Sequence, residues 1–113
     1  MADIVHNVAG VGKVVAATNR YILGDVSAGT AGSMAIQIDL QGGTGTFDFY
    51  VRLRGAGLDW KAALAYPVSA PTTGASSVSG DNIWMIDATG KDVSVNVTAA
   101  TGSPEVAFVP CVG

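Results

Sequence analysis

The chain has 113 residues, of which 49% are hydrophobic and 13% are charged, and its formal net charge is −3. A domain of this length can bury a core without metals or disulfides, and the high apolar content excludes an intrinsically disordered chain. The acidic balance and the lack of a basic stripe argue against nucleic-acid binding, and the single cysteine, Cys111, excludes an intrachain disulfide.

The first part of the chain differs in composition from the rest. Residues 1–20 contain small residues and glycines, and we predict an extended N-terminal arm with a first short strand there. They lack the basic start and long apolar run of a signal peptide, and no apolar run in the chain is long enough to span a bilayer, so we expect no membrane partner. Residues 21–113 are predicted to form a single domain, with an early strand at 20–26.

Three later segments, 33–40, 46–54 and 91–99, alternate apolar and polar residues, as half-buried antiparallel strands do. Two shorter apolar runs at 82–87 and 105–112 predict further strands. The residues predicted to face the core are Met34, Ile36, Ile38, Leu40, Phe47, Phe49, Val51, Leu53, Val93, Val95 and Val97.

Turn residues separate these runs. The segments 41–46, "QGGTGT", and 87–92, "DATGKD", are predicted to be tight hairpin connections. Residues 59–66 fit either a short helix or a strand, and 69–80 form a polar loop. The spacing predicts an all-β fold, an antiparallel β-sandwich of about seven to nine short strands with an extended N-terminal arm.

Few residues suggest chemistry. His6 is the single histidine and has no cysteine cluster near it, whereas a metal site or a general base needs further partners at defined geometry. Asp81, Asp87 and Asp92 flank predicted turns, where Asp is favoured for its backbone hydrogen bonds. We therefore expect no enzyme activity, no catalytic residue, no metal site and no cofactor.

The segment "FDFYVRLRG" presents a distinctive polar face, formed by Asp48, Tyr50, Arg52 and Arg54. This face is either solvated or a protein contact, in which Tyr and Arg are favoured. The tryptophans also leave two interpretations open. Trp60 and Trp84 either form an exposed platform for sugar rings, or at least one of them fills the core, which we favour.

From "GGTGTFDFYVRLRGAGLDWKAALAY" onward, the chain resembles small β-sandwich modules of tailed-bacteriophage structural proteins, most closely capsid decoration (cement) proteins. Trp60, Trp84, Gly90 and the run 93–98 occupy the places of the recurring family motifs, and the resemblance covers about residues 33–112. "GAGLDW" lacks the usual Asp-Gly pair before the tryptophan, and Ser94 stands where arginine is frequent.

The resemblance implies a virion protein on the capsid exterior, made in the host cytoplasm, that stabilises the shell by protein–protein contacts. The implied partners are the major capsid protein and further copies of the chain, as a homotrimer. The arm would bind by adding a strand to a neighbour, and arginines would pair with acidic capsid surfaces. The candidate partner-binding residues are Ile4, Val5, Arg20, Tyr21, Tyr50, Arg52 and Arg54.

Two other functions remain open from the sequence. The chain could be a different virion component, such as a tail, neck or fibre module. It could also be a carbohydrate-binding or adhesin-like β-sandwich that uses Trp60, Trp84 and Tyr50.

Overall fold

The computed structural model describes residues 2–24, 32–55 and 57–111. These residues form eleven strands. The strands are β1 (Ala2–His6), β2 (Lys13–Val14), β3 (Asn19–Leu23), β4 (Ser33–Asp39), β5 (Thr44–Leu53), β6 (Lys61–Ala62), β7 (Tyr66–Pro67), β8 (Ser77–Val78), β9 (Asn82–Asp87), β10 (Lys91–Thr101) and β11 (Glu105–Cys111). The four strands β2, β6, β7 and β8 have two residues each, so the longer strands number seven.

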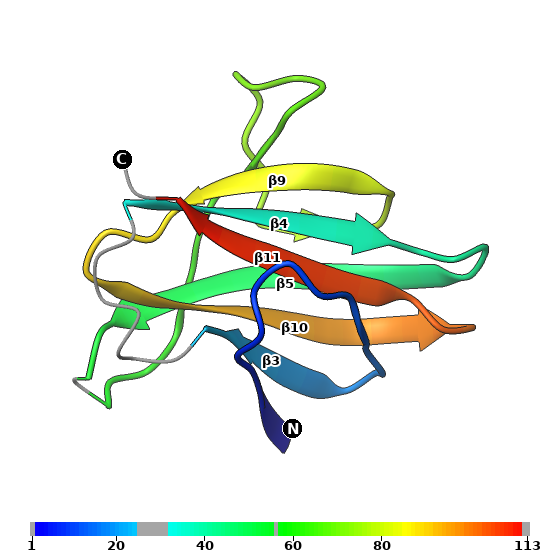
Figure 1. Ribbon diagram of the computed structural model, residues 1–113, viewed down its shortest axis with the longest axis horizontal. Coiled ribbons are helices and arrows are strands. Elements are labelled where there is room, and N and C mark those ends of the chain that lie inside the picture. Colours follow the sequence, from blue (N-terminus) through cyan, green and yellow to red (C-terminus); the bar gives the residue numbers. More distant parts are fainter. Residues whose placement is uncertain (1, 25–31, 56, 112–113) are drawn as a thin grey trace.

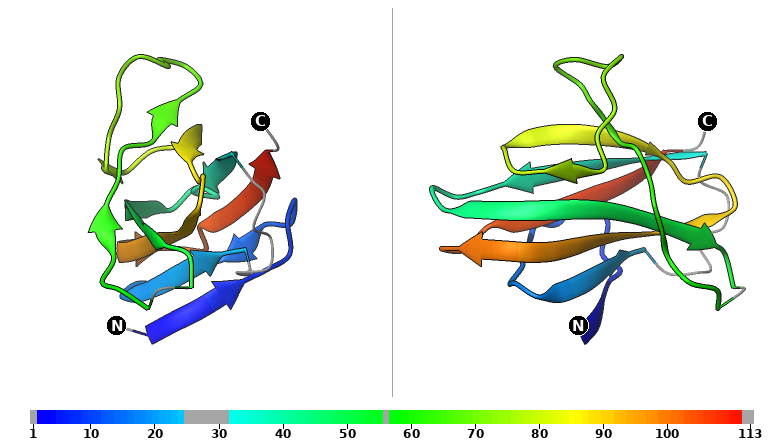
Figure 2. Two further views of the ribbon diagram at one scale, coloured as in Figure 1. Left: turned by 90° about the vertical axis from the view of Figure 1, so that its left-hand side faces the viewer. Right: turned by 180° about the vertical axis from the view of Figure 1, so that it is seen from behind.

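The strands form two sheets packed face to face (Figures 1 and 2). Sheet A has the order β1-β3-β10-β5-β6, and β8 also pairs with β5. Sheet B has the order β2-β11-β4-β9-β7. The β1–β3 pair is parallel, and the other strand pairs are antiparallel. The predicted antiparallel β-sandwich is confirmed.

The two predicted hairpins are wrong, because in each of them the strands before and after the turn lie in different sheets. β4 pairs with β11 and β9, whereas β5 pairs with β10. The connection 40–43 therefore crosses between the sheets, and so does the turn 88–90 between β9 and β10. Glycine-rich segments serve both kinds of tight connection, so turn chemistry alone does not say which strands pair.

The core lies between the sheets and consists mostly of the predicted inward residues. Phe47, Phe49 and Ile36 are completely buried, and Leu40 and Val51 are partly buried against the core. Leu53 corrects the prediction, because its side chain is 60% exposed. Leu53 is the last residue of β5. The alternation of the strand directs its side chain to the same side as Phe49, but the core ends before this position.

The N-terminal segment belongs to both layers. β1 is an edge strand of sheet A, and β2 pairs with β11 in sheet B. The predicted arm therefore contributes one strand to each sheet (Figure 1, dark blue). Gly10, with a positive φ of 77°, turns the chain between them, and its N–H donates to the carbonyl of Phe108 at 2.8 Å.

Two predicted segments are shorter than expected. The early strand 20–26 is observed as β3, and its residues 25 and 26 lie outside the described residues. In the segment 59–66, β6 covers Lys61–Ala62 and β7 begins at Tyr66, so the strand interpretation holds there and the helical one is wrong.

Candidate functional site

The outer face of sheet A brings most of the predicted partner-binding residues together. The strand register places Arg20 of β3 opposite Asn96 of β10, and Arg52 of β5 opposite Asp92. Tyr50 lies opposite Ser94 in the centre of the face. Directly opposed residues share one face of a sheet, so segments distant in sequence meet here.

Trp60 lies over this face and joins its two arginines. The guanidinium carbon of Arg52 is 4.2 Å from the centroid of the Trp60 ring, and that of Arg20 is 5.2 Å from it. Arg20 also lies 5.6 Å from the centroid of the Tyr50 ring. These distances are within the range of cation–π attraction. We call Arg20, Tyr50, Arg52 and Trp60 the Arg–Trp cluster.

A buried polar layer orients the cluster. The Nε of Arg20 donates to Oδ1 of Asn96 at 2.8 Å, and the Nε of Arg52 donates to Oδ2 of Asp92 at 3.3 Å. The Asp92 and Asn96 side chains are buried although they face away from the core. The long arginine and tryptophan side chains therefore form an outer layer that covers this face of the sheet.

Ser94 is the least exposed residue of the polar layer. Arg20 lies opposite Asn96 and Arg52 lies opposite Asp92, and Ser94 stands between these two partners on the same face of β10. The indole that contacts both guanidinium groups therefore lies over Ser94. Within the described residues, its Oγ has no hydrogen-bond partner, and neither has Oδ1 of Asp48.

Tyr21 corrects the sequence prediction, because its side chain is buried in the core. Its hydroxyl accepts a hydrogen bond from the backbone N–H of Ala16 at 2.9 Å. Neighbouring residues of a strand point to opposite faces, so Arg20 and Tyr21 cannot both face a partner. Ile4 and Val5 are also neighbours in one strand and point to opposite faces. Ile4 is packed against the core, whereas Val5 is 53% exposed.

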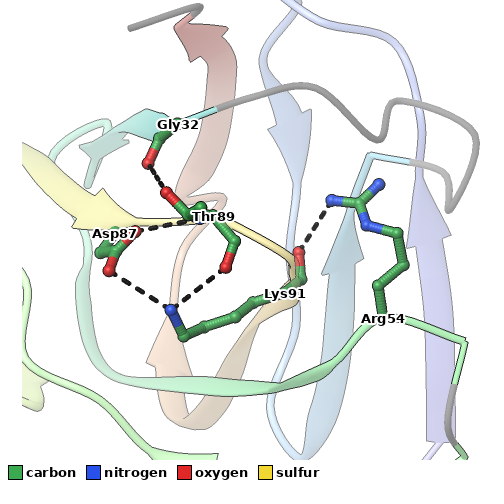
Figure 3. Close-up of polar contacts among 5 residues, drawn as sticks. All are labelled: Gly32, Arg54, Asp87, Thr89 and Lys91. Atoms are coloured by element: carbon green, nitrogen blue, oxygen red, sulfur yellow. Dashed lines mark hydrogen bonds and ion pairs between the residues drawn. The ribbon is translucent and has the colours of Figure 1, made fainter.

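Arg54 lies at a turn, apart from the Arg–Trp cluster. One of its terminal nitrogens donates to the carbonyl of Lys91 at 3.0 Å (Figure 3). In the same turn, Asp87 accepts hydrogen bonds from the N–H of Thr89 at 2.9 Å and from Nζ of Lys91 at 3.3 Å. The bond from the Thr89 backbone is the main reason why the pKa of Asp87 is lowered. This arrangement is that of a well-formed turn.

The two tryptophans lie on different sides of sheet A. Trp84 is 8% exposed and contacts Phe49, with ring centroids 5.8 Å apart. The prediction that at least one tryptophan fills the core is confirmed. A sugar platform that combines Trp84 with Trp60 and Tyr50 is ruled out, because Trp84 faces the core while the other two lie on the outer face.

The fold resembles that of a phage-related protein of known structure. The crystal structure of the SPBc2 prophage-derived protein YomS superposes with a TM-score of 0.65, over 91% of this chain and 84% of that chain. The aligned sequences are 16% identical, so this likeness establishes a shared fold. No family model matches the sequence, and no curated protein matches it.

Two further observations bear on chemistry. Within residues 2–24, 32–55 and 57–111, no three His, Cys, Asp or Glu side chains come together as a metal site would require. None of the described residues belongs to a helix long and apolar enough to cross a bilayer.

His6 fixes the N-terminal segment rather than forming a site. Its Nε2 donates to the carbonyl of Val11 at 2.9 Å, and its ring meets Phe108 edge-on at a centroid distance of 5.0 Å. Burial is the main cause that lowers the pKa of His6 below 6.5, and the charge of Lys13 adds to it. The imidazole is therefore neutral and clamps the β1–β2 connection at neutral pH.

We expect the protein to lose stability as the pH falls below about 6.5, the ordinary pKa of histidine. The unfolded chain then binds a proton that the folded chain resists, and the loss is complete below the lowered folded pKa. Urea unfolding between pH 7.5 and pH 5, compared for the wild type and His6→Gln, measures this effect. An unchanged pH slope in the His6→Gln variant would assign the loss to other groups.

Sequence reasoning missed the roles of Trp60 and Asp92. The alternation of β10 indicates that Asp92, Ser94 and Asn96 share one face, but it does not reveal that this face is covered. The cover comes from Trp60, whose position depends on the path of the chain after β5.

Proposed function

We propose that this chain is a structural protein of a tailed-bacteriophage virion, and specifically a capsid decoration (cement) protein. It would bind the outer capsid surface and stabilise the shell through protein–protein contacts. The observation that carries the proposal is the fold shared over 91% of the chain with a prophage-derived protein. The family motifs around Trp60, Trp84 and 93–98 in the sequence support the same class of function.

The N-terminal segment is the surface proposed to bind the major capsid protein. β1 is an edge strand, and an edge strand can accept a further strand through main-chain hydrogen bonds. Four valines of this segment have more than half of their side chains exposed, namely Val5, Val8, Val11 and Val14. An apolar edge of this kind is typical of a contact surface.

The Arg–Trp cluster is the second proposed contact. Trp, Tyr and Arg are the residues that dominate binding energy at protein interfaces. Arg20 and Arg52 are already held by Asn96 and Asp92, so little side-chain freedom remains to be lost on binding. This cluster would join copies of the chain into the expected homotrimer.

Cryo-electron microscopy of particles with and without this protein tests the proposal. We expect density for a two-layer β-sandwich at regular positions on the outer capsid surface, and its loss from particles that lack the protein. Density on the tail, neck or fibres instead would replace the decoration proposal by the other virion role.

A substitution at the β1 edge tests the capsid contact. We expect Val5→Glu to weaken binding to undecorated capsids about tenfold, equivalent to ~1.4 kcal/mol, because it places a charge in an apolar contact. Co-sedimentation with capsids at increasing protein concentration measures the change. Leu58→Glu is the matched control, since Leu58 is 57% exposed and lies outside the segment. Equal binding by Val5→Glu and the wild type would argue against β1 as the contact.

A carbohydrate-binding function has one remaining argument, which is the partly exposed Trp60 beside Tyr50. Binding to a glycan array that disappears in Trp60→Ala, without any capsid binding by the wild type, would favour that function.

A further inference from the structure

The outer face of sheet B is unlike that of sheet A, because small and apolar side chains cover it. The register aligns Val109, Ala35, Met85 and Tyr66 in one row across β11, β4, β9 and β7. The next row consists of Ala107, Gln37 and Ile83. Neither row contains a charged residue. We call these seven residues the apolar face of sheet B.

The apolar face of sheet B is hollowed over its two alanines. A depression of about 240 Å³ is lined by Gly10, Ala35, Gln37, Ile83, Ala107, Phe108 and Val109. Val109 is 47% exposed and Ile83 is 37% exposed, so their side chains stand above the alanines. A hollow of this size, lined mainly by small and apolar groups, can take one large side chain of a partner.

The margin of this face is acidic. At one end of the sheet, Asp39 of β4 lies opposite Glu105 of β11, and Asp81 stands directly before β9. Asp87 ends β9 at the other end, where Lys91 pairs with it, and the basic residue in the strands of sheet B is Lys13. Two copies that met through this same face would bring carboxylates together, which is unfavourable.

The outer face of sheet A has the complementary chemistry. Its outermost groups are the indole of Trp60 and the guanidinium groups of Arg20 and Arg52, while the carboxylate of Asp92 is buried beneath them. The side chain of Arg52 is 26% exposed against 7% for Asp92, so a partner meets the cation first.

We propose that the apolar face of sheet B is the docking surface for the Arg–Trp cluster of a second copy of this chain. Trp60 of one copy enters the hollow over Ala35 and Ala107 of the next, and its flanking arginines face the acidic margin. The two surfaces lie on opposite sides of the sandwich (Figure 2), so every copy offers one of each. This inference goes beyond the proposed function, because it does not depend on where the protein sits on a particle.

A contact between two different surfaces has a geometric consequence. It leaves one surface of each kind free in a pair, so association continues into a ring or a stack. A trimer with threefold symmetry also requires such a heterologous contact. The wild type is therefore expected to exceed the mass of a dimer as its concentration rises.

Two variants that each block one surface test this proposal. Trp60→Ala removes the anchor from sheet A, and Val109→Arg places a cation beside the hollow in sheet B. In sedimentation velocity we expect each variant alone to be monomeric at concentrations where the wild type associates. An equimolar mixture should form one-to-one heterodimers and nothing larger, since it contains one intact surface of each kind. Association of the wild type should weaken at least tenfold in high salt.

Three results would overturn the proposal. These are a monomeric wild type at all concentrations, continued association of Trp60→Ala alone, and a mixture of the variants that stays monomeric. Thermal unfolding by circular dichroism verifies that each variant is folded, and Ile83→Arg replaces Val109→Arg if the latter unfolds. Leu53→Arg is the control, because Leu53 is 60% exposed and outside both surfaces. Capsid binding is measured separately, so failure of self-association leaves the proposed function to its own test.

Discussion

Replacing Phe49 by alanine is expected to lower the free energy of unfolding by about 3–5 kcal/mol. The Phe49 side chain is completely buried between the sheets and contacts the ring of Trp84. Its removal loses the transfer free energy of the ring and leaves a cavity that the two packed sheets cannot close. Urea unfolding followed by tryptophan fluorescence measures the change.

Leu53 supplies the matched control on the same strand. Its side chain points to the same side of β5 as Phe49 but is 60% exposed. Leu53→Ala should therefore change the free energy of unfolding by less than about 0.5 kcal/mol. The measurement is made at concentrations where the protein is monomeric. Similar losses for the two substitutions would contradict the observed end of the core.

Replacing Arg52 by leucine is expected to have the next largest effect on stability, about 2 kcal/mol. The substitution leaves the carboxylate of Asp92 buried without its ion-pair partner, and it removes one of the two guanidinium groups that contact Trp60. This expected loss of stability is smaller than that for a fully buried ion pair, because the Arg52 side chain is partly exposed to solvent.

A double-mutant cycle separates the pair from its surroundings. Asp92→Leu in the Arg52→Leu background should restore part of the lost stability, because no buried charge then remains unpaired. Lys91→Leu is the control, since it breaks the exposed pair with Asp87 and should have a much smaller effect. Strictly additive effects of the substitutions at Arg52 and Asp92 would show that the two side chains are not coupled.

Strand geometry brings some of the predicted partner-binding residues together and separates others, for one physical reason. Arg20, Tyr50 and Arg52 meet on the outer face of sheet A, although 30 residues or more separate Arg20 from the other two. Tyr21 was wrong because it follows Arg20 directly and so points into the core. By alternation Arg54 would point to the same side as Arg52, but it lies beyond the end of β5. There it donates a hydrogen bond to the backbone carbonyl of Lys91.

The sequence by itself determined the all-β class, the position of most of the longer strands and the side of the sheet on which most residues lie. These properties are local, because a strand exposes alternate residues to alternate faces and turns need residues such as glycine. This period of two predicts which residues face the core, and five of them are fully buried as predicted, namely Phe47, Phe49, Val93, Val95 and Val97.

The tertiary structure alone decided which strands pair and what covers each sheet. The crossing of the chain between sheets after β4 and β9, and the parallel addition of β1 to β3, depend on contacts between distant segments. The Arg–Trp cluster and the apolar face of sheet B arise in the same way, because each requires side chains from three or more strands or their connections. A period along the chain does not encode which strand lies beside which, since several pairings bury the same residues.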